Sequence, residues 1–302
     1  MTKKATLLTV LLALLAFESS KAQSIDFLRQ RIDSLLEDKS AMVGVAVRGT
    51  NSQDTISING DTRLPMQSIF KYHLALAVLH QIDQGEFSLE QVISLDKELM
   101  DSYKHLWSLL RKRYPEGGDV SLREILTLTV ANSDNVGCDV LYKLIGGPAV
   151  VENYMHQMGI ADIAIKYNEL TMQTVWEYQY ENWTTAKATN TTLMTFFENS
   201  HQQLTKKSYD FLWGTMKQSW HPKVSMKSFL PENTIIAHKT GHSGKNDKGI
   251  TAAQNDIGII FLPDGTYFYL SVLVSDSKEE ANVNKKIIAD ITKLCWDYFS
   301  KE

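Results

Sequence analysis

The sequence predicts an α+β protein in which an antiparallel sheet is flanked by helices and an all-α lobe is inserted into the chain. Three observations support this fold class. The 302 residues are 43% hydrophobic and 22% charged, an ordinary globular composition with ample material for a core. Strand-like runs lie near both ends of the chain, whereas the middle has helical spacing. We therefore expect the two ends to build one sheet together.

Residues 1–22 are typical of a secretory signal peptide. Two lysines give a positive start, a run of apolar residues follows, and Ser20-Lys21-Ala22 resembles a cleavage site. The apolar run is short for a membrane span, and no later stretch reaches about 20 apolar residues. We therefore expect a secreted protein without a membrane anchor, located in the periplasm of a Gram-negative bacterium.

The expected elements of the sheet come from both ends of the chain. Helical apolar spacing covers residues 25–39 and is followed by two strand-like runs with a polar turn between them. The strands are expected at 41–49, 54–60, 233–240, 252–262 and 266–275, and a last helix at 278–299. Pro263-Asp264-Gly265-Thr266, between the last two strands, is a strong hairpin signal.

The middle of the chain is expected to be helical. Its segments are separated by Gly, Pro and Asn signals. They cover 68–84, 121–130, 134–145, 148–158 and 185–199, and a further helix follows Leu204. We expect residues 23–62 with 205–302 to form an α/β lobe, and residues 63–204 to form the all-α lobe. A cleft between two lobes is a common place for a small-molecule site.

Charge and composition argue against several classes of function. A formal net charge of −4, from 31 basic and 35 acidic residues, gives no electrostatic footprint for nucleic acid. The eight histidines and two cysteines show no tight metal-ligand spacing, so we expect no metal and no cofactor. Cys138 and Cys295 fall in different predicted helices and are expected to be buried and unpaired. We expect a monomer whose partner is a small molecule.

A serine followed three residues later by a lysine occurs three times in the chain. The pairs are Ser68 with Lys71, Ser94 with Lys97, and Ser275 with Lys278. Only Ser68 opens a long apolar helix, where free N–H groups and the positive end of the helix dipole favour a developing anion. Lys71 projects from the same helix face, so its amine can activate the hydroxyl. Ser68 is therefore the candidate nucleophile.

Two further short motifs follow in a fixed order. Ser133-Asp134-Asn135 lies at an expected helix start, where the ordinary role of Ser or Asp is an N-cap. Lys239-Thr240-Gly241 ends an expected strand, where the ordinary role is a turn. Each motif alone is weak. The order S-x-x-K, S-D-N, K-T-G, with helices between the first two and a return to strand before the third, is a strong joint signal.

With these motifs the sequence resembles the class A active-site serine β-lactamases over essentially the whole mature chain. The resemblance implies a β-lactamase/transpeptidase-like fold with the site between the lobes. It implies hydrolysis of the β-lactam amide of penicillins and cephalosporins through a serine acyl-enzyme, which confers antibiotic resistance. In that reaction Ser68 would be the acylated nucleophile and Lys71 its base or proton relay.

The resemblance also implies roles for residues around the nucleophile. Ser133 would pass a proton to the β-lactam nitrogen, and Asn135 would bind the side-chain amide of the substrate. The substrate-binding residues near the third motif would be Lys239, Thr240, Gly241, His242 and Ser243. Lys239 and Thr240 would hold the substrate carboxylate, and the backbone amides of Ser68 and His242 would stabilise the oxyanion. Trp107 would wall the cleft, with a core role as the alternative.

A deacylating glutamate is implied in an irregular loop near 164–184. The family segment E-x-x-x-N matches "NELTMQ", which gives Glu169 as the base for water and Gln173 in place of the asparagine. The family's bracing Arg and Asp correspond to Tyr167 and Asn182. Because the usual salt bridge is then absent, we expect an unbraced, more open loop.

These departures resemble the PER- and VEB-type extended-spectrum branch, as do Gln67 and the run "HKTGHSG". An open loop would admit bulky oxyimino-cephalosporins. The arginine with which the family often binds the carboxylate is replaced by Lys223 or Lys227.

Two alternative functions share the three motifs. One is a penicillin-binding D,D-peptidase, which lacks the deacylating glutamate, so Glu169 argues against it. The other is a non-hydrolytic β-lactam-sensing domain, a class usually tethered to membrane segments that this sequence does not show after its signal peptide.

Overall fold

The computed structural model describes residues 24–219 and 225–300. The predicted signal peptide and Lys223 lie outside these residues. Across the two described ranges, no helix is long and apolar enough to cross a membrane.

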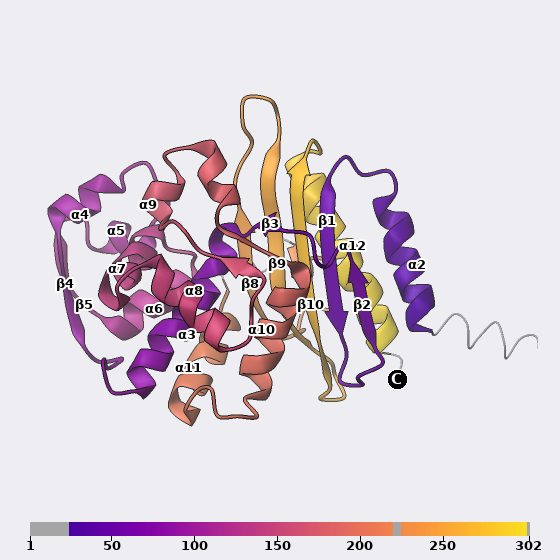
Figure 1. The fold of residues 1–302 in the computed structure, drawn as a ribbon, viewed down its shortest axis with the longest axis horizontal. Helices are drawn as coiled ribbons and strands as arrows, with labels where there is room; N and C mark the ends of the chain where they lie inside the picture. Colours follow the sequence, from indigo (N-terminus) through magenta and orange to yellow (C-terminus); the bar gives the residue numbers. More distant parts are fainter. Residues whose placement is uncertain (1–23, 220–224, 301–302) are drawn as a thin grey trace, which may run out of the picture.

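A five-stranded antiparallel sheet joins the two ends of the chain, as the sequence predicts (Figure 1). Its strands, in spatial order, are β2 (Thr55–Ile58), β1 (Met42–Arg48), β10 (Tyr267–Ser277), β9 (Thr251–Phe261) and β8 (Ile236–His242). β1 pairs with β10 over its whole length, from Met42 opposite Ser275 to Arg48 opposite Tyr269. The predicted hairpin between β9 and β10 is also confirmed, because Leu262 N–H donates to the Thr266 carbonyl at 2.8 Å.

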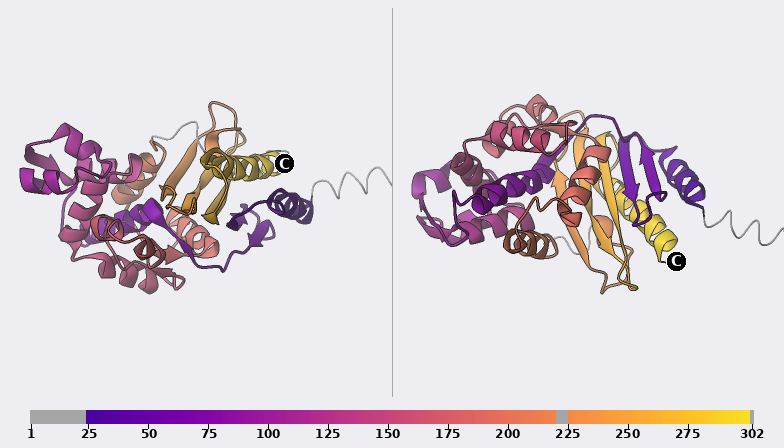
Figure 2. Two further views of the ribbon diagram at one scale, coloured as in Figure 1. Left: turned by 90° about the horizontal axis from the view of Figure 1, so that it is seen from above. Right: turned by 60° about the horizontal axis from the view of Figure 1, so that its bottom comes forward.

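Helices α2 (Ile25–Leu36) and α12 (Ala281–Phe299) cover one face of this sheet (Figure 2). Because side chains alternate along a strand, every second residue of β10 points to these helices. Phe268, Leu270, Val272 and Val274 join a core with Ile288 of α12. Tyr269 and Leu273 point the other way and join the core of the helical part of the molecule. The sheet is thus buried on both faces.

The other face of the sheet meets a large group of helices around α3. They are α3 (Phe70–Asp83), α4 (Lys97–Ser102), α5 (Leu109–Arg113), α6 (Leu122–Ala131), α7 (Asn135–Ile145), α8 (Pro148–Gln157), α9 (Glu169–Met172), α10 (Ala186–Glu198) and α11 (Lys206–Met216). In addition, 3-10 turns η1, η2 and η3 cover Gln67–Ile69, Trp176–Tyr180 and Ser225–Lys227. All residues from Phe70 to Leu79 are buried. A helix that is buried on every side belongs at the centre of a bundle, which is where α3 lies.

The long helices agree with the sequence prediction, whereas several short elements were missed. Strands β4 (Val92–Asp96) and β5 (Gly117–Ser121) form a separate hairpin, and α4, α5 and α9 have too few residues to show a helical period. Gly117 has a φ of 82°, and a Cβ there would lie 2.3 Å from the Leu95 carbonyl oxygen. Glycine is therefore required where these two strands approach each other. Both cysteines are buried and free, as predicted.

A small three-stranded sheet fixes the two ends of the loop near 164–184. Its strands are β3 (Leu64–Pro65), β7 (Trp183–Thr184) and β6 (Ile163–Ala164). β6 enters the loop and β7 leaves it, and the two pair directly. β3 pairs with β7 and leads straight into η1. The start of the loop, its end and the candidate nucleophile turn are therefore joined through one sheet.

The packing of α12 on the sheet predicts a specific loss of stability. Ile288 is fully buried in the core under α12, so Ile288→Ala should lower the free energy of unfolding by about 3 kcal/mol. Ile235 is 54% exposed, so Ile235→Ala should change the free energy by less than about 0.5 kcal/mol. Urea unfolding followed by circular dichroism measures both values. Equal losses in the two variants would contradict this packing.

Candidate active site

The candidate nucleophile lies in a tight turn just before α3. Ser68 is half-buried in η1, and the α-helix begins two residues later at Phe70. The turn is tighter than the helix start that the sequence predicts. Gln67, directly before it, has a φ of 46°, in the left-handed region. Ser68 therefore sits among the first N–H groups of a helical segment, which have no carbonyl partner within the helix.

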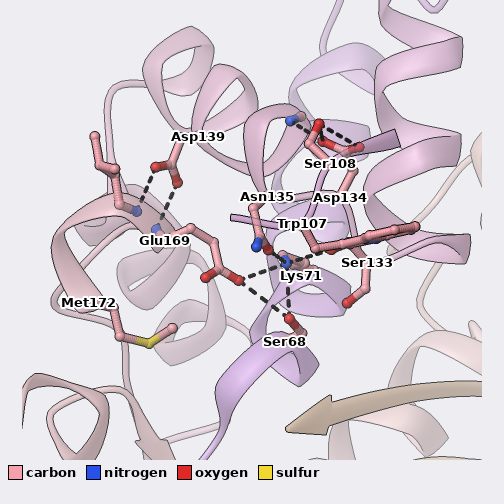
Figure 3. Close-up of polar contacts among 12 residues, drawn as sticks. Ser68, Lys71, Trp107, Ser108, Ser133, Asp134, Asn135, Asp139, Glu169 and Met172 are labelled. Atoms are coloured by element: carbon pink, nitrogen blue, oxygen red, sulfur yellow. Dashed lines mark hydrogen bonds and ion pairs between the residues drawn. The ribbon is translucent and has the colours of Figure 1, made fainter. Parts of the chain in front are cut away.

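Lys71 is the centre of the polar contacts in the site (Figure 3). Its side chain is completely buried, and its ammonium nitrogen lies 2.9 Å from Ser68 Oγ. Three further oxygens surround it: Glu169 Oε1 at 2.7 Å, Asn135 Oδ1 at 2.6 Å and the Ser133 carbonyl oxygen at 3.0 Å. A buried ammonium must be paired and hydrogen-bonded. These four oxygens meet that requirement, and they place the hydroxyl and the carboxylate on one cation.

Glu169 is the first residue of the short helix α9 and is 1% exposed. Its Oε1 atom lies 3.3 Å from Ser68 Oγ, so this carboxylate reaches both the hydroxyl and Lys71. Asn168 is the N-cap of α9 and accepts a hydrogen bond from Thr171 N–H at 3.1 Å. The cap fixes the first turn of α9 and hence the direction of the Glu169 side chain. The structure thus brings the predicted base and the predicted nucleophile together.

Asp139 holds the start of α9, a role that sequence reasoning missed. Its two carboxylate oxygens accept from the N–H groups of Glu169 at 2.8 Å and Leu170 at 2.9 Å. Burial raises the pKa of Asp139 to about 6, while donation from the Tyr103 hydroxyl at 2.5 Å counteracts the rise. A signal was present in the sequence, because Asp139 lies four residues after Asn135 and hence on the same face of α7.

The expectation of an unbraced loop is wrong. Asn182 is fully buried, and its Oδ1 atom accepts from the N–H groups of Lys166 at 2.8 Å and Tyr167 at 3.0 Å. Its Nδ2 donates to the Tyr167 carbonyl at 2.8 Å. The Tyr167 ring also stacks on Tyr178, with centroids 4.4 Å apart. The salt bridge is absent as predicted, but neutral amide bonds and an aromatic pair brace the loop in its place.

Gln173 directly follows α9. Its backbone N–H donates to the Glu169 carbonyl at 3.2 Å, which closes the turn, and its side chain is exposed. Met172 is the buried neighbour. The Gln173 side chain is therefore accessible at the end of the turn that carries Glu169.

Ser133 links the two lysines of the site. Its φ of 59° is left-handed, and it directly precedes Asp134, the N-cap of α7. The Ser133 carbonyl accepts from Lys71, while its Oγ accepts from Lys239 Nζ at 2.8 Å. Burial and the positive charge of Lys71 lower the pKa of Lys239 to about 7. Near neutral pH, Lys239 can therefore exchange a proton with the Ser133 hydroxyl.

The buried carboxylate of Asp134 fixes the Ser133 turn against α5. It accepts from Ser108 Oγ at 2.9 Å, Leu110 N–H at 2.7 Å and Gly137 N–H at 2.8 Å. The ordinary N-cap role that the sequence suggested for this motif is thus real. Because Asp134 fills that role, Ser133 and Asn135 are left to face Lys71.

Trp107 lies next to the Ser133 turn (Figure 3). Its indole N–H donates to the Asn132 carbonyl at 3.1 Å, and the Lys112 ammonium lies 3.9 Å from its ring centre. The side chain is 41% exposed, which excludes the alternative core role. Its place beside Ser133 suits an aromatic wall.

The third motif approaches the nucleophile turn through a glycine. A Cβ on Gly241 would lie 2.6 Å from the Met66 carbonyl oxygen and 3.1 Å from Ser68 N, so only glycine fits this contact. Asn255 of β9 donates from Nδ2 to the carbonyls of Pro65 at 2.8 Å and Met66 at 3.1 Å. These contacts seat η1 against the end of β8.

The residues on either side of Gly241 form the end of β8, beside the nucleophile turn. Thr240 is half-buried and His242 is exposed. Ser243 donates its N–H to the Ala253 carbonyl at 3.0 Å, and this keeps the chain paired with β9 beyond the strand end. Lys227, one of the two lysines considered for the carboxylate, is half-buried at the end of η3.

Within residues 24–219 and 225–300, no group of three or more His, Cys, Asp or Glu side chains is arranged to hold a metal ion. The polar groups of the site described above are two hydroxyls, two amines and a carboxylate. The arrangement can activate Ser68 as a nucleophile, and it can activate a water beside Glu169.

Comparison with known proteins places this chain in a family. A family model described as the beta-lactamase enzyme family matches residues 27–299. Beta-lactamase VEB-1 of Pseudomonas aeruginosa is 43% identical, over 98% of each chain. Extended-spectrum beta-lactamase PER-1 of the same species is 39% identical, over 95% of this chain and 91% of the relative.

Solved structures agree with the sequence comparison. The crystal structure of TLA-1 extended-spectrum beta-lactamase is 46% identical with a TM-score of 0.87, over 91% of this chain and 99% of that chain. A class A beta-lactamase from Bacteroides cellulosilyticus is 33% identical with a TM-score of 0.86, over 91% of this chain and 98% of that chain.

The bracing of the loop by Asn182 predicts a local effect. Asn182→Ala leaves two part-buried N–H groups and one carbonyl without their partner, at a cost of up to about 1 kcal/mol each. Amide hydrogen exchange in residues 163–184, measured by mass spectrometry, should become at least about tenfold faster.

The matched control is Asn199→Ala, which removes similar amide bonds to the backbone of Leu204 in a different loop. It should leave exchange in residues 163–184 unchanged. Wild-type exchange in the Asn182 variant would show that the loop is held by other contacts.

Proposed function

The chain belongs to the class A serine β-lactamases, and we propose that it hydrolyses penicillins and cephalosporins through an acyl-enzyme on Ser68. The observation that carries this mechanism is the Lys71 ammonium, which contacts Ser68 Oγ at 2.9 Å and Glu169 Oε1 at 2.7 Å. One buried cation thus joins the nucleophile to a carboxylate.

Acylation begins with the removal of the Ser68 proton. A proton shift from Lys71 Nζ to Glu169 Oε1, over 2.7 Å, leaves a neutral amine 2.9 Å from the hydroxyl. That amine takes the hydroxyl proton as Ser68 Oγ attacks the β-lactam carbonyl carbon. The carbonyl oxygen becomes an oxyanion, which the backbone N–H groups of Ser68 and His242 stabilise.

Opening of the ring needs a proton on the lactam nitrogen. Ser133 donates its hydroxyl proton as the carbon–nitrogen bond breaks, and Lys239, 2.8 Å from Ser133 Oγ, supplies a replacement. The lowered pKa of Lys239, about 7, makes this transfer accessible near neutral pH. The products of this half-reaction are the Ser68 ester and the opened ring.

Before deacylation, Glu169 releases to solvent the proton that it received from Lys71, and Lys239 takes one up, so both groups regain their starting charge. Deacylation then uses the Glu169 carboxylate as the base. It takes a proton from a water that attacks the ester carbonyl, and the proton returns to Ser68 Oγ through Lys71 as the ester bond breaks. Because Glu169 is 1% exposed and held by Asp139, the carboxylate is fixed before the water arrives. We propose that Gln173, which stands in the position of the family's asparagine and has an exposed side chain, contacts the bound substrate.

The remaining residues of the cleft bind the substrate. Asn135 binds the side-chain amide of the β-lactam, and Trp107 walls the cleft. Lys239, Thr240 and Ser243 bind the carboxylate, with Gly241 allowing close approach. Two of the similar proteins, PER-1 and TLA-1, are named extended-spectrum enzymes, which supports the same range of substrates, oxyimino-cephalosporins included, for this chain.

We further propose that residues 1–22 are a signal peptide and that the mature protein works in the periplasm as a monomer without nucleic acid. The pattern of lysines, apolar run and small-residue site supports export. We also propose the division into an α/β lobe of residues 23–62 with 205–302 and an all-α lobe of residues 63–204.

Removal of the nucleophile tests the mechanism. Ser68→Ala should lower turnover of a chromogenic cephalosporin by a factor on the order of 10⁴ or more, because no covalent intermediate can form. The matched control is Ser94→Ala, in a second S-x-x-K pair, whose exposed hydroxyl bonds Asp119 at 2.6 Å. The control should retain wild-type turnover. Turnover near wild type in the Ser68 variant would refute the assignment.

Removal of the base separates the two half-reactions. Glu169→Ala should still form an adduct on Ser68, with the Lys71 proton passing to solvent instead of to Glu169, but should hydrolyse it at least about 10³-fold more slowly. Intact-mass measurement after mixing should therefore find one stable adduct. Glu177→Ala, which removes an exposed carboxylate from the same loop, should leave no adduct. Free turnover by the Glu169 variant would mean that another group is the base.

A further inference from the structure

We propose that Gln67 and Gln179 form a positioning pair that holds the nucleophile turn in its reactive conformation. The bridge between their side chains keeps the Gln67 backbone left-handed, and this directs the N–H and hydroxyl of Ser68 into the cleft. The inference deepens the proposed function and rests on the role given there to Ser68.

The backbone at Gln67 is the unusual feature. Its φ of 46° lies in a region that residues with a Cβ rarely adopt, and it immediately precedes Ser68. The side chain is buried, at 4% exposure. A strained conformation persists only where the surrounding structure over-determines it. The contacts of this buried side chain can therefore maintain the conformation of the turn.

The Gln67 side chain ends on the loop that also carries Glu169. Its Nε2 donates to Gln179 Oε1 at 2.7 Å, and Gln179 Nε2 donates to the Trp176 carbonyl at 2.7 Å. Gln179 is itself 4% exposed. Buried amides that lose their partner are costly, so this chain of two bonds strongly favours one position for Gln67.

The acceptor end of the bridge is rigid. Gln179 lies in η2. The residue after it, Tyr180, is the last of η2 and donates its hydroxyl to Asp276 Oδ1 of β10 at 2.5 Å. Tyr178, just before Gln179, stacks on Tyr167. η2 is thus tied both to the sheet and to the start of the loop. A bridge to such a segment can hold a backbone angle, whereas a bridge to a loose segment could not.

The neighbours of Gln67 are held by backbone contacts. Met66 N–H donates to the Asn182 carbonyl at 2.8 Å, and the Met66 carbonyl accepts from Asn255 at 3.1 Å. On the other side, Phe70 is the first residue of the buried helix α3. With both sides fixed, the backbone angle at Gln67 decides where Ser68 points. Relaxation of that angle would slow formation of the oxyanion in both half-reactions without touching Lys239.

The test compares alanine with glycine at position 67. Glycine adopts positive φ without strain, so it does not need the bridge, whereas alanine does. Gln67→Ala should lower kcat on a chromogenic cephalosporin about tenfold with KM within twofold of wild type. Gln67→Gly should stay within threefold of the wild-type kcat. A purely structural role predicts that the melting temperature and the amount of folded enzyme fall while kcat per folded molecule stays at the wild-type value in both variants.

A second comparison removes the acceptor. Gln179→Ala should lower kcat about tenfold in the wild-type background and by less than twofold in the Gln67→Gly background. Melting temperatures of all four variants are recorded alongside, so that a loss of folded protein is not read as a loss of rate.

The inference is overturned if Gln67→Gly is as slow as Gln67→Ala, if Gln67→Ala retains wild-type kcat, or if Gln179→Ala is equally slow in both backgrounds. Intact-mass measurement on the wild-type protein comes first. If the wild type shows no adduct on Ser68 when quenched during turnover and the Glu169→Ala variant traps none, the proposed function fails and this inference fails with it. If the adduct is present, the kcat comparisons test only the role of the Gln67–Gln179 pair.

Discussion

The burial of the Lys71 ammonium is the constraint on which the rest of the site depends. An unpaired cation inside a protein is costly, so its four oxygen partners must all be in place. These partners come from three separate parts of the chain: η1, the start of α7 with the turn before it, and α9. Folding of the helical part of the molecule therefore brings the nucleophile, the carboxylate and the amine together in one step.

The sheet contributes a second buried amine and the wall behind the nucleophile. Lys239 reaches the same serine, Ser133, whose carbonyl contacts Lys71, so the two positive charges lie on either side of one residue. Burial and the nearby positive charge of Lys71 lower the pKa of Lys239 to about 7. The approach of β8 depends on the missing side chain at Gly241. Strands from one part of the chain thus complete a site that the helices begin.

Much of this architecture could be predicted from sequence because its signals are local. Periodicity gave the long helices and strands, and three short motifs gave Ser68, Ser133 and Lys239. Bonds between distant segments were missed, since no local pattern encodes them: Asn182 bonds the backbone near Tyr167, and Gln67 bonds a residue 112 positions away. The unbraced loop was a wrong inference for the same reason, because a missing salt bridge does not reveal the neutral bonds that replace it.

The most direct test of this account is to count turnovers of a chromogenic cephalosporin by the purified mature protein and then weigh the intact protein. The account holds that Lys71 and Glu169 serve both formation and hydrolysis of the Ser68 ester. It predicts many turnovers per molecule and little residual adduct once substrate is consumed. A single stoichiometric burst that leaves one stable adduct would contradict it, because acylation would then proceed without a working base for water.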